Sequence, residues 1–240
     1  MNFLDRLIFC QPGGQFREYT GITAHLEPRD LSLYRRLLPP PLTLPSRPIV
    51  TLYIVDFTRV VRWPLTRYQE WSVLLKCSLD AHEGWFSITM PVTKWVPMKG
   101  GRHIGFPKYV ADEIKIEKEG GRFVARGRHK GIEQLRIEFD PGLTRPLAAW
   151  EIELMDDPSF FKGPRIFQLV PPGFGPRLLR IKLEHVVEPH WSPLPGMVKV
   201  KVDRSESWAG LLREDCPFPG TANHFVGGVN IVSEAIAPTR

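Results

Sequence analysis

The chain has 240 residues, of which 42% are hydrophobic and 24% are charged, and its formal net charge is +6 at pH 7. The basic residues are interspersed with acidic ones and form no tract, which argues against a nucleic-acid-binding protein. No apolar run reaches the roughly 18 residues that span a membrane, and three scattered cysteines form no disulfide framework. These features favour a cytoplasmic globular protein with neither a membrane nor a nucleic-acid partner.

The first part of the chain contains one segment with a clear helical pattern. Residues 1–13 favour a short helix or an arm, and residues 16–24 alternate as a strand does. The helical pattern begins after Asp30, where apolar side chains recur at the spacing of helix turns. Because proline cannot continue a helix, we expect this helix to end at the prolines 39–41 and to pack on a sheet.

From residue 49 onward, the sequence consists mainly of β-branched and aromatic runs. Two pairs of runs are joined by glycine-containing turns, at residues 80–84 and 120–121, which predicts two β-hairpins. A second helix is expected near residues 206–213, after a capping residue at Asp203 or Ser205. The predicted strands cover residues 50–57, 71–79, 85–92, 113–118, 122–128, 134–139, 149–155, 178–187 and 197–202, and an apolar run interrupted by glycine closes the chain at residues 225–235.

No change of composition marks a domain boundary. The proline- and glycine-rich segment 171–176 suits a loop as well as a linker, and no internal repeat is present. We therefore expect residues 1–240 to form a single domain that is mainly β (α+β), with a few short helices. A sheet of so many strands avoids exposed edges by curling into a closed or partly closed barrel.

Most familiar catalytic motifs are absent from the sequence. It contains no His-Glu-x-x-His motif and no cluster of cysteine and histidine, so it predicts no metal site. His185 and His190 are five residues apart, a spacing that places them on opposite faces of a strand. There is also no Gly-x-Ser-x-Gly elbow and no glycine-rich loop of the kind that binds phosphates.

One segment, residues 100–109, combines three glycines, a proline and a single lysine. The glycines allow positive φ angles or a close approach of the backbone, and Pro107 extends the residue before it, so we expect a rigid turn. Lys108 follows this turn directly. If Lys108 is solvated, it is an ordinary surface lysine in a loop. In an apolar pocket, however, its ammonium is disfavoured and the neutral amine becomes a nucleophile.

Three short motifs occur in a particular order along the chain. Phe16-Arg17-Glu18-Tyr19 precedes the helix that ends at the prolines, Tyr68-Gln69-Glu70 opens a strand, and Gly101-Arg102-x-x-Gly-Phe-Pro-Lys108 follows. This order resembles the acetoacetate decarboxylase-like family, and the last motif is the most specific of the three. The resemblance extends over nearly the whole chain and weakens after about residue 140.

The resemblance implies a fold, an assembly and roles for several residues. The family's fold is a β-rich, cone-like barrel around an internal cavity, and its members usually assemble into homo-oligomers. Lys108 matches the lysine that forms a Schiff base with a keto acid, Arg17 the arginine near the substrate carboxylate, and Glu70 a glutamate that positions groups in the pocket. Met90 and Phe106 are expected to be apolar lining. The chemistry requires neither a metal nor an organic cofactor.

The sequence departs from the decarboxylase pattern at three positions. Tyr109 stands where a second lysine follows the first, His103 replaces an acidic residue, and Tyr53 lies near the place of another pocket glutamate. These three residues are candidates for acid/base groups. Each also has a simpler explanation, since tyrosines at strand ends often belong to a core or rim and His103 suits a turn.

Three functions remain open at this point. The first is a lyase that decarboxylates a small keto acid through a Schiff base on Lys108. The second keeps the Schiff base but performs aldol condensation and dehydration on a 2-oxo acid such as pyruvate. The third is a β-barrel protein that binds a small acidic or apolar ligand without turnover. The basic net charge suits all three functions and does not distinguish them.

Overall fold

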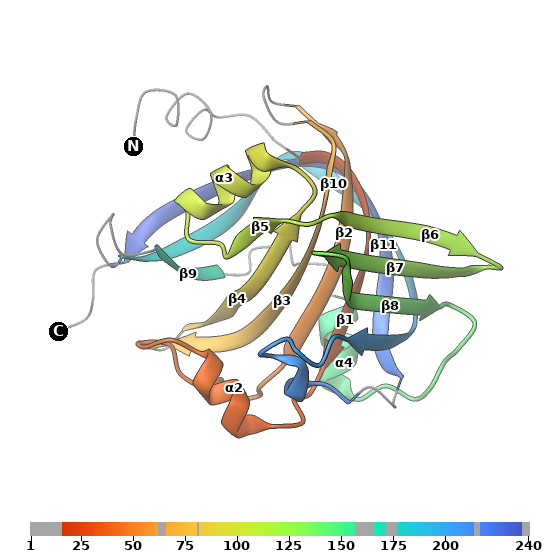
Figure 1. Ribbon diagram of the computed structural model, residues 1–240, viewed down its shortest axis with the longest axis horizontal. Coiled ribbons are helices and arrows are strands. Elements are labelled where there is room, and N and C mark those ends of the chain that lie inside the picture. The colour runs from red at the N-terminus through yellow and green to blue at the C-terminus, as the bar shows by residue number, and fades with distance from the viewer. Residues whose placement is uncertain are drawn as a thin grey trace.

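The computed structural model describes residues 16–61, 66–80, 82–156, 166–170, 177–213 and 217–236 (Figure 1). The predicted arm at residues 1–13 and the segment 171–176 lie outside these residues. The strands are β1 (Phe16–Leu26), β2 (Val50–Val60), β3 (Tyr68–Leu79), β4 (His82–Val92), β5 (Lys108–Val110), β6 (Glu113–Glu119), β7 (Arg122–His129), β8 (Ile132–Asp140), β9 (Ile166–Val170), β10 (Arg177–Val202) and β11 (Phe218–Ile236). The helices are α2 (Leu31–Leu37), α3 (Trp95–His103) and α4 (Ala149–Asp156), with a 3₁₀ turn η1 (Ala209–Leu211).

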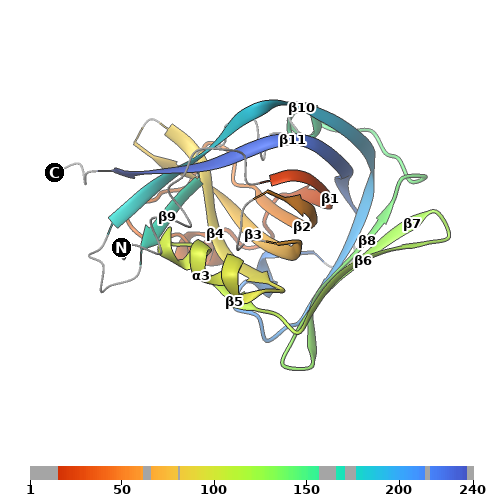
Figure 2. The same cartoon turned by 90° about the horizontal axis from the view of Figure 1, so that it is seen from above.

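All of these strands belong to one eleven-stranded sheet. Its order is β11-β1-β2-β3-β4-β9-β10-β8-β7-β6, while β5 pairs with β4 and β10 also pairs with β11. The sheet curls into a cone, and the β6–β8 strands extend from it as a flange (Figures 1 and 2). The mainly β fold is confirmed, but the cone is not a closed barrel, because β4 and β9 share only two register pairs, Trp85 with Ile166 and Phe86 with Phe167.

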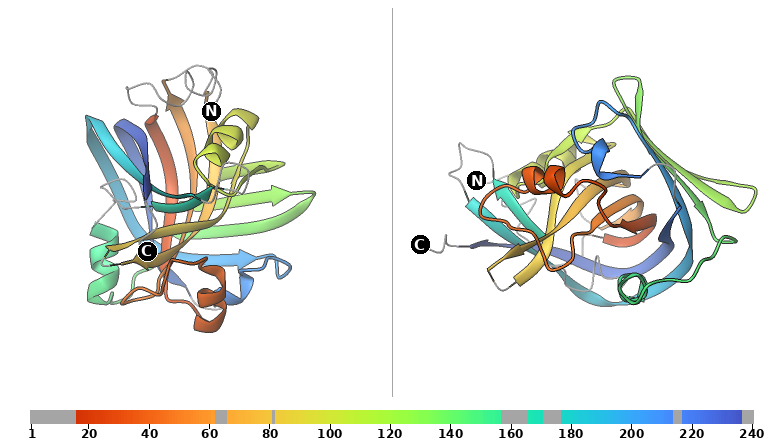
Figure 3. Two further views of the ribbon diagram at one scale, coloured as in Figure 1. Left: turned by 90° about the vertical axis from the view of Figure 1, so that its left-hand side faces the viewer. Right: turned by 90° about the horizontal axis from the view of Figure 1, so that it is seen from below.

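The helix predicted after Asp30 is confirmed as α2, which lies across one end of the cone (Figure 3). The Asp30 carboxylate caps it by accepting hydrogen bonds from the backbone N–H groups of Ser32 and Leu33, at 2.8 and 2.9 Å. The helix is fixed to the sheet by Tyr34, which is buried and donates its hydroxyl to the carbonyl of Ile49 at 2.9 Å.

The strands β1–β4 bury both of their faces, and the two faces differ in chemistry. Leu52, Ile54 and Trp71 lie on what we call the core face, which packs with the apolar side chains of β8 and β10. Tyr53 and Tyr68 lie on the opposite side, which we call the lysine face, together with Met90, Phe106 and Ile166. Successive side chains of a strand point to opposite sides, so each strand supplies both faces.

The strand predicted at residues 149–155 is wrong, because this segment forms helix α4. Its apolar and acidic residues alternate as in a strand, but the Glu151 carboxylate reaches back to the Ala148 N–H at 2.8 Å, as in a capping box. Arg145 holds the same carboxylate at 2.6 Å, which fixes the start of the helix. The helix expected at residues 206–213 is reduced to η1, and the strands 178–187 and 197–202 are parts of one long strand, β10.

Across the described residues, no helix is both long enough and apolar enough to cross a membrane.

Candidate active site

The segment around Lys108 begins as a helix and not, as expected, as a turn. α3 continues through Gly100 and Gly101 to His103 and ends in a Schellman motif. The N–H of Phe106 donates to the carbonyl of Gly101 at 3.0 Å, and that of Gly105 donates to Arg102 at 3.1 Å. Gly105 has a φ of 88°, a left-handed conformation that favours glycine. The predicted turn is therefore confined to residues 104–107.

Pro107 then directs the chain into the short strand β5. The N–H of Lys108 donates to the carbonyl of Phe106 at 2.8 Å, which closes a three-residue turn around Pro107. Such a turn requires a φ near the value that the proline ring imposes. β5 runs parallel to β4 with Lys108 opposite Met90, so the lysine side chain joins the lysine face.

Gly101 gives the Lys108 side chain its space. A Cβ atom added to Gly101 would lie 2.5 Å from Cε of Lys108 and would also overlap its Cδ. The aliphatic part of the lysine therefore passes directly over the last turn of α3. This close approach explains why glycine occupies position 101, although it is a poor helix former.

The Lys108 ammonium contacts a buried carboxylate. Nζ of Lys108 donates to Oε2 of Glu70, and the hydroxyl of Tyr53 donates to Oε1 of the same carboxylate at 2.6 Å. Lys108 is 7% exposed and Glu70 is 4% exposed. The Nζ atom also lies 5.7 Å from the ring centroids of both Tyr68 and Phe106. An amine, a carboxylate and a phenol thus form one hydrogen-bonded row between aromatic walls.

Both tyrosines of this cluster are held in their neutral form. Burial, and then the negative charge of Glu70, raise the pKa of the Tyr53 phenol well above its usual value. The same two causes raise the pKa of the Tyr68 phenol. Tyr53 therefore stays a hydrogen-bond donor to Glu70 at neutral pH. A buried ion pair costs desolvation energy and is weak support for stability, so a buried lysine in such a pair is a candidate for chemistry.

Of the other residues predicted for substrate binding, Met90 and Phe106 lie beside this cluster, and Arg17 lies farther along the sheet, in β1. Met90 is 2% exposed and lies beside Lys108 in the sheet, and Phe106 supplies one of the aromatic walls. Arg17 is half-buried in a β-bulge at the start of β1, directly after Phe16, whose ring is 6.4 Å from that of Tyr68. Among the described residues, Arg17 has no hydrogen bond or ion pair, and its role as a carboxylate clamp remains a prediction.

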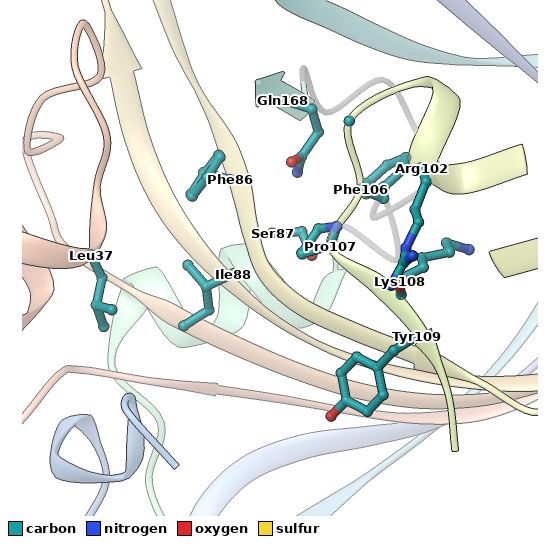
Figure 4. Close-up of a pocket in the computed structure, with 11 residues that line it drawn as sticks. Leu37, Phe86, Ser87, Ile88, Arg102, Phe106, Pro107, Lys108, Tyr109 and Gln168 are labelled. Atoms are coloured by element: carbon teal, nitrogen blue, oxygen red, sulfur yellow. Dashed lines mark hydrogen bonds between the residues drawn. The ribbon is translucent and has the colours of Figure 1, made fainter. Parts of the chain in front are cut away.

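Tyr109 and His103 lie away from the amine. The side chains of Tyr109 and Lys108 point to opposite sides of β5 (Figure 4), and the Tyr109 hydroxyl donates to Oε1 of Gln134 at 2.8 Å. This placement argues against an acid/base role for Tyr109 at the amine. His103 is the last residue of α3 and is half-buried, so its acid/base role stays a prediction.

Three residues near the site received no role from the sequence, although Tyr68 and Arg102 belong to the quoted motifs. Tyr68 precedes Glu70 by two residues, so the period of a strand could have placed it on the same face. Arg102 donates its Nε to the carbonyl of Lys108 at 2.6 Å. Gln168 of β9 is 1% exposed and lines a pocket that Arg102 also borders. No local pattern signals Gln168, because its position depends on how β9 joins the sheet.

A pocket of about 620 Å³ lies beside the segment 105–109 (Figure 4). Its walls are largely apolar and include Phe86, Ile88 and Pro107. Pockets of this size accept small organic ligands. As to metals, the part of the chain that the structure describes contains no group of three or more His, Cys, Asp or Glu side chains that could hold an ion.

Comparisons with known proteins place this geometry in context. An acetoacetate decarboxylase shares the fold with a TM-score of 0.74 and 16% identity, over 95% of this chain and 91% of the other. The acetoacetate decarboxylase of Legionella pneumophila subsp. pneumophila str. Philadelphia 1 has a TM-score of 0.67 and 19% identity, over 93% and 87% of the two chains. A search of curated proteins finds no match to this sequence.

A third similar structure is the enduracididine biosynthesis enzyme MppR complexed with pyruvate. Its TM-score is 0.68 and its identity 16%, over 94% of this chain and 91% of MppR. MppR is also known with the condensation product of pyruvate and imidazole 4-carboxaldehyde. In sequence, residues 16–177, more than half of the chain, match the family described as acetoacetate decarboxylase (ADC). The chain therefore belongs to the acetoacetate decarboxylase family.

Proposed function

We propose that this protein is a carbon–carbon lyase that forms a Schiff base between Lys108 and a small keto acid. The observation that supports this most is the buried contact between the Lys108 amine and the Glu70 carboxylate, enclosed by the rings of Tyr68 and Phe106. A nucleophilic amine, a base in contact with it and a site sheltered from water are the groups that Schiff-base chemistry requires.

The first step generates and uses the free amine. Glu70 accepts a proton from the Lys108 ammonium, and the neutral amine then adds to the ketone carbon of the substrate. A water molecule leaves the resulting carbinolamine, and an iminium forms. Tyr53 keeps the carboxylate oriented through its 2.6 Å hydrogen bond. Because Tyr53 stays neutral, it can serve as a donor throughout this step.

The iminium makes decarboxylation of a 3-oxo acid favourable. The bond to the carboxyl carbon breaks, carbon dioxide leaves, and the electron pair moves toward the iminium nitrogen to give an enamine. Protonation of the enamine carbon and addition of water then release the ketone and the free amine. In this mechanism Arg17 holds the substrate carboxylate before it leaves, since a guanidinium fork matches a carboxylate.

A second candidate function uses the same iminium for an aldol reaction. Here Glu70 removes a proton from the carbon next to the iminium of a 2-oxo acid, and the enamine attacks an aldehyde. The contact of Lys108 with a carboxylate supports this candidate, because aldol chemistry needs a base at the iminium.

Borohydride trapping tests the proposal. The protein is incubated with acetoacetate or with pyruvate, reduced with borohydride, digested, and analysed by peptide mass spectrometry. We expect an adduct at Lys108 that is lost in Lys108→Ala and retained in Lys99→Ala, which removes an exposed lysine on α3. If a folded protein gives no adduct at Lys108 with either acid, the Schiff-base proposal is wrong and a binding protein becomes the better explanation.

A second measurement separates the two enzyme candidates. Carbon dioxide release from acetoacetate, absent in Lys108→Ala, supports the decarboxylase. Labelling of Lys108 by pyruvate without carbon dioxide release from acetoacetate supports the aldol candidate instead, and product analysis with added aldehydes then follows.

A further inference from the structure

A row of hydrogen bonds leads away from the Lys108–Glu70 pair along the lysine face. Tyr53 donates to the carboxylate of Glu70 at 2.6 Å. Ser72 lies opposite Tyr53 in the ladder between β2 and β3. Burial raises the pKa of the Tyr53 phenol, and a hydrogen bond from the Ser72 hydroxyl opposes that rise. The row of hydrogen bonds therefore continues from the phenol to Ser72.

Ser72 extends this row to the neighbouring strand. Its Oγ lies 3.0 Å from Oγ of Ser87 in β4, and it can also donate to the carbonyl of Thr89 at 2.8 Å. A hydroxyl carries one proton and two lone pairs, and it rotates between acceptors. Ser72 can therefore donate to Tyr53 while it accepts from Ser87. The two serines are 0% and 1% exposed, so the row is sheltered from bulk water.

The row ends at a gap in the sheet. On the edge away from β3, β4 pairs with β9 up to Phe86 and with β5 from Met90 onward, so residues 87–89 have no strand partner there among the described residues. Ser87 lies in this gap and lines the 620 Å³ pocket (Figure 4). The pocket is partly open to solvent, and its walls include Phe86 and Ile88, which pack with the core face. The hydrogen bonds thus connect the enclosed amine with a pocket on the other side of the sheet.

Gln168 lies beside this outer end of the row. Phe167, the residue before it, pairs with Phe86 of β4. Ser87 comes next in β4, and both Ser87 and Gln168 line the pocket. Gln168 is 1% exposed, and neither Nε2 nor Oε1 has a hydrogen-bond partner in the described part of the chain. Buried amides are seldom left unpaired, and water often completes them. An amide in this place is suited to hold a water molecule that passes a proton to Ser87.

Decarboxylation requires a proton from outside the site. The bond to the carboxylate breaks and a C–H bond replaces it, so each carbon dioxide that leaves is matched by the uptake of one proton. In the proposed mechanism, Glu70 has already returned its proton to the departing water when the enamine forms. A new proton is needed at that stage, although the buried residues and the bound substrate exclude solvent.

We propose that the hydroxyls of Tyr53, Ser72 and Ser87 relay protons between the pocket and the carboxylate. In one concerted shift, a proton passes from solvent in the pocket to Ser87 and on through Ser72 to Tyr53. Tyr53 gives its own proton to Glu70, which then protonates the enamine carbon. Each hydroxyl loses one proton and gains one, so neither a tyrosinate nor an alkoxide remains. This inference rests on the proposed function, because the enamine forms on Lys108.

Deuterium exchange separates this proton transfer from Schiff-base formation. In reverse, the last step removes a proton from bound acetone or pyruvate, and the relay replaces that proton with a deuteron from the solvent. The protein is incubated with acetone or pyruvate in heavy water, and NMR measures the loss of methyl protons. Borohydride trapping at Lys108 under the same conditions measures the Schiff base. The readout is the ratio of the exchange rate to the trapping rate, which a partial loss of folded protein does not change.

Two variants each interrupt the relay at one point. Ser72→Ala and Ser87→Ala should each lower this ratio at least about tenfold, because proton transfer by a positioned group accelerates a step by about 10²–10⁴. The double variant should be no worse than either single variant, since one break already interrupts a series, whereas independent losses would multiply. Ser87→Ala keeps the hydrogen bond from Ser72 to Thr89, so it leaves the local fold in place.

Thr51→Val is the matched control. Thr51 is 1% exposed and pairs with Leu74 of the lysine face, but its hydroxyl hydrogen-bonds Nδ1 of His25 at 2.8 Å, outside the row. This variant should leave the ratio of exchange to trapping unchanged. An unchanged ratio in both serine variants, or an equal fall in Thr51→Val, overturns the relay.

The two proposals fail in different ways. If the parent protein gives neither trapping at Lys108 nor exchange of methyl protons, the proposed function is wrong and the relay falls with it. If the parent protein is trapped but does not exchange, or if the serine variants keep the full ratio, the lyase stands and the relay is wrong.

Discussion

The core face and the lysine face of strands β1–β4 are built from neighbouring residues and yet bury opposite kinds of groups. Leu52 and Trp71 belong to an apolar cluster, whereas Tyr53 and Glu70, each one residue away, lie on the face that holds three buried tyrosines and an ion pair. Apolar burial stabilises a fold, but a buried charge pair does so only weakly. The comparison suggests that one side of the sheet supplies the stability that the reactive groups on the other side require.

The ion pair on the lysine face offers the largest expected effect. Glu70→Leu leaves the Lys108 ammonium buried without its partner, and the free energy of unfolding should fall by about 3–5 kcal/mol. The double variant Lys108→Met/Glu70→Leu removes both charges, so its stability should return to that of the parent protein or exceed it. Urea unfolding measures both values. If the double variant is no more stable than the single one, the pair contributes to the fold itself.

On the core face, Leu52→Ala should remove stability without touching the chemistry. Leu52 is fully buried, and its truncation should lower the free energy of unfolding by about 2–5 kcal/mol. Borohydride trapping at Lys108 should keep its rate per folded molecule. A large fall in trapping, at a temperature where the variant is fully folded, would show that the two faces are not independent.

The adjacent residue should behave in the opposite way. Tyr53→Phe removes the hydroxyl that donates to Glu70, which should cost about 1.5–3 kcal/mol of stability and also slow trapping at Lys108 about tenfold. The matched control is Tyr34→Phe, which removes a buried hydroxyl that bonds to backbone carbonyls. The Tyr34→Phe control should lose stability but keep its rate of trapping at Lys108. Equal trapping rates in the two variants would remove Tyr53 from the mechanism.

The smallest effect on stability is expected for Gly101→Ala. Alanine favours a helix by up to about 1 kcal/mol over glycine, but its Cβ would displace the Lys108 side chain, so stability should change little. Trapping at Lys108 should nevertheless slow about tenfold or more, since a displaced amine loses its approach to the carbonyl. Gly142→Ala, in the loop after β8, is the control and should leave trapping unchanged. Normal trapping in Gly101→Ala would mean that the Lys108 side chain can take another conformation from which its amine still reaches the carbonyl.

The sequence predicted those parts of the fold that local patterns determine. α2 follows from an aspartate cap and a proline stop, and the hairpins β3–β4 and β6–β7 follow from their turns. α4 was missed because its apolar and acidic residues alternate as in a strand, while its capping contacts become visible only in three dimensions. α3 was missed because it contains Gly100 and Gly101, and glycine is a poor helix former. The reason for glycine at position 101 is its close contact with the Lys108 side chain, which is visible only in three dimensions.

Three residues of the candidate site were predictable one by one, but their arrangement was not. Lys108, Glu70 and Tyr53 were all candidates, yet their contact depends on the pairing of β2 with β3 and of β4 with β5. The same pairing turns Tyr109 to the other side. Gln168 could not be found, because its position on the lysine face is set by the register of β9 against β4 and β10.

The short seam between β4 and β9 has a consequence for motion. Two register pairs join these strands, whereas β10 and β11 are paired along nearly their whole length. Local opening begins where the fewest contacts must be given up, so the seam should separate at a lower free energy than the long ladder. Amide protons at the seam should accordingly exchange with deuterium earlier than those of β10 and β11. The wall of the cone is therefore expected to open first at this seam, where Trp85 and Phe86 pair with Ile166 and Phe167.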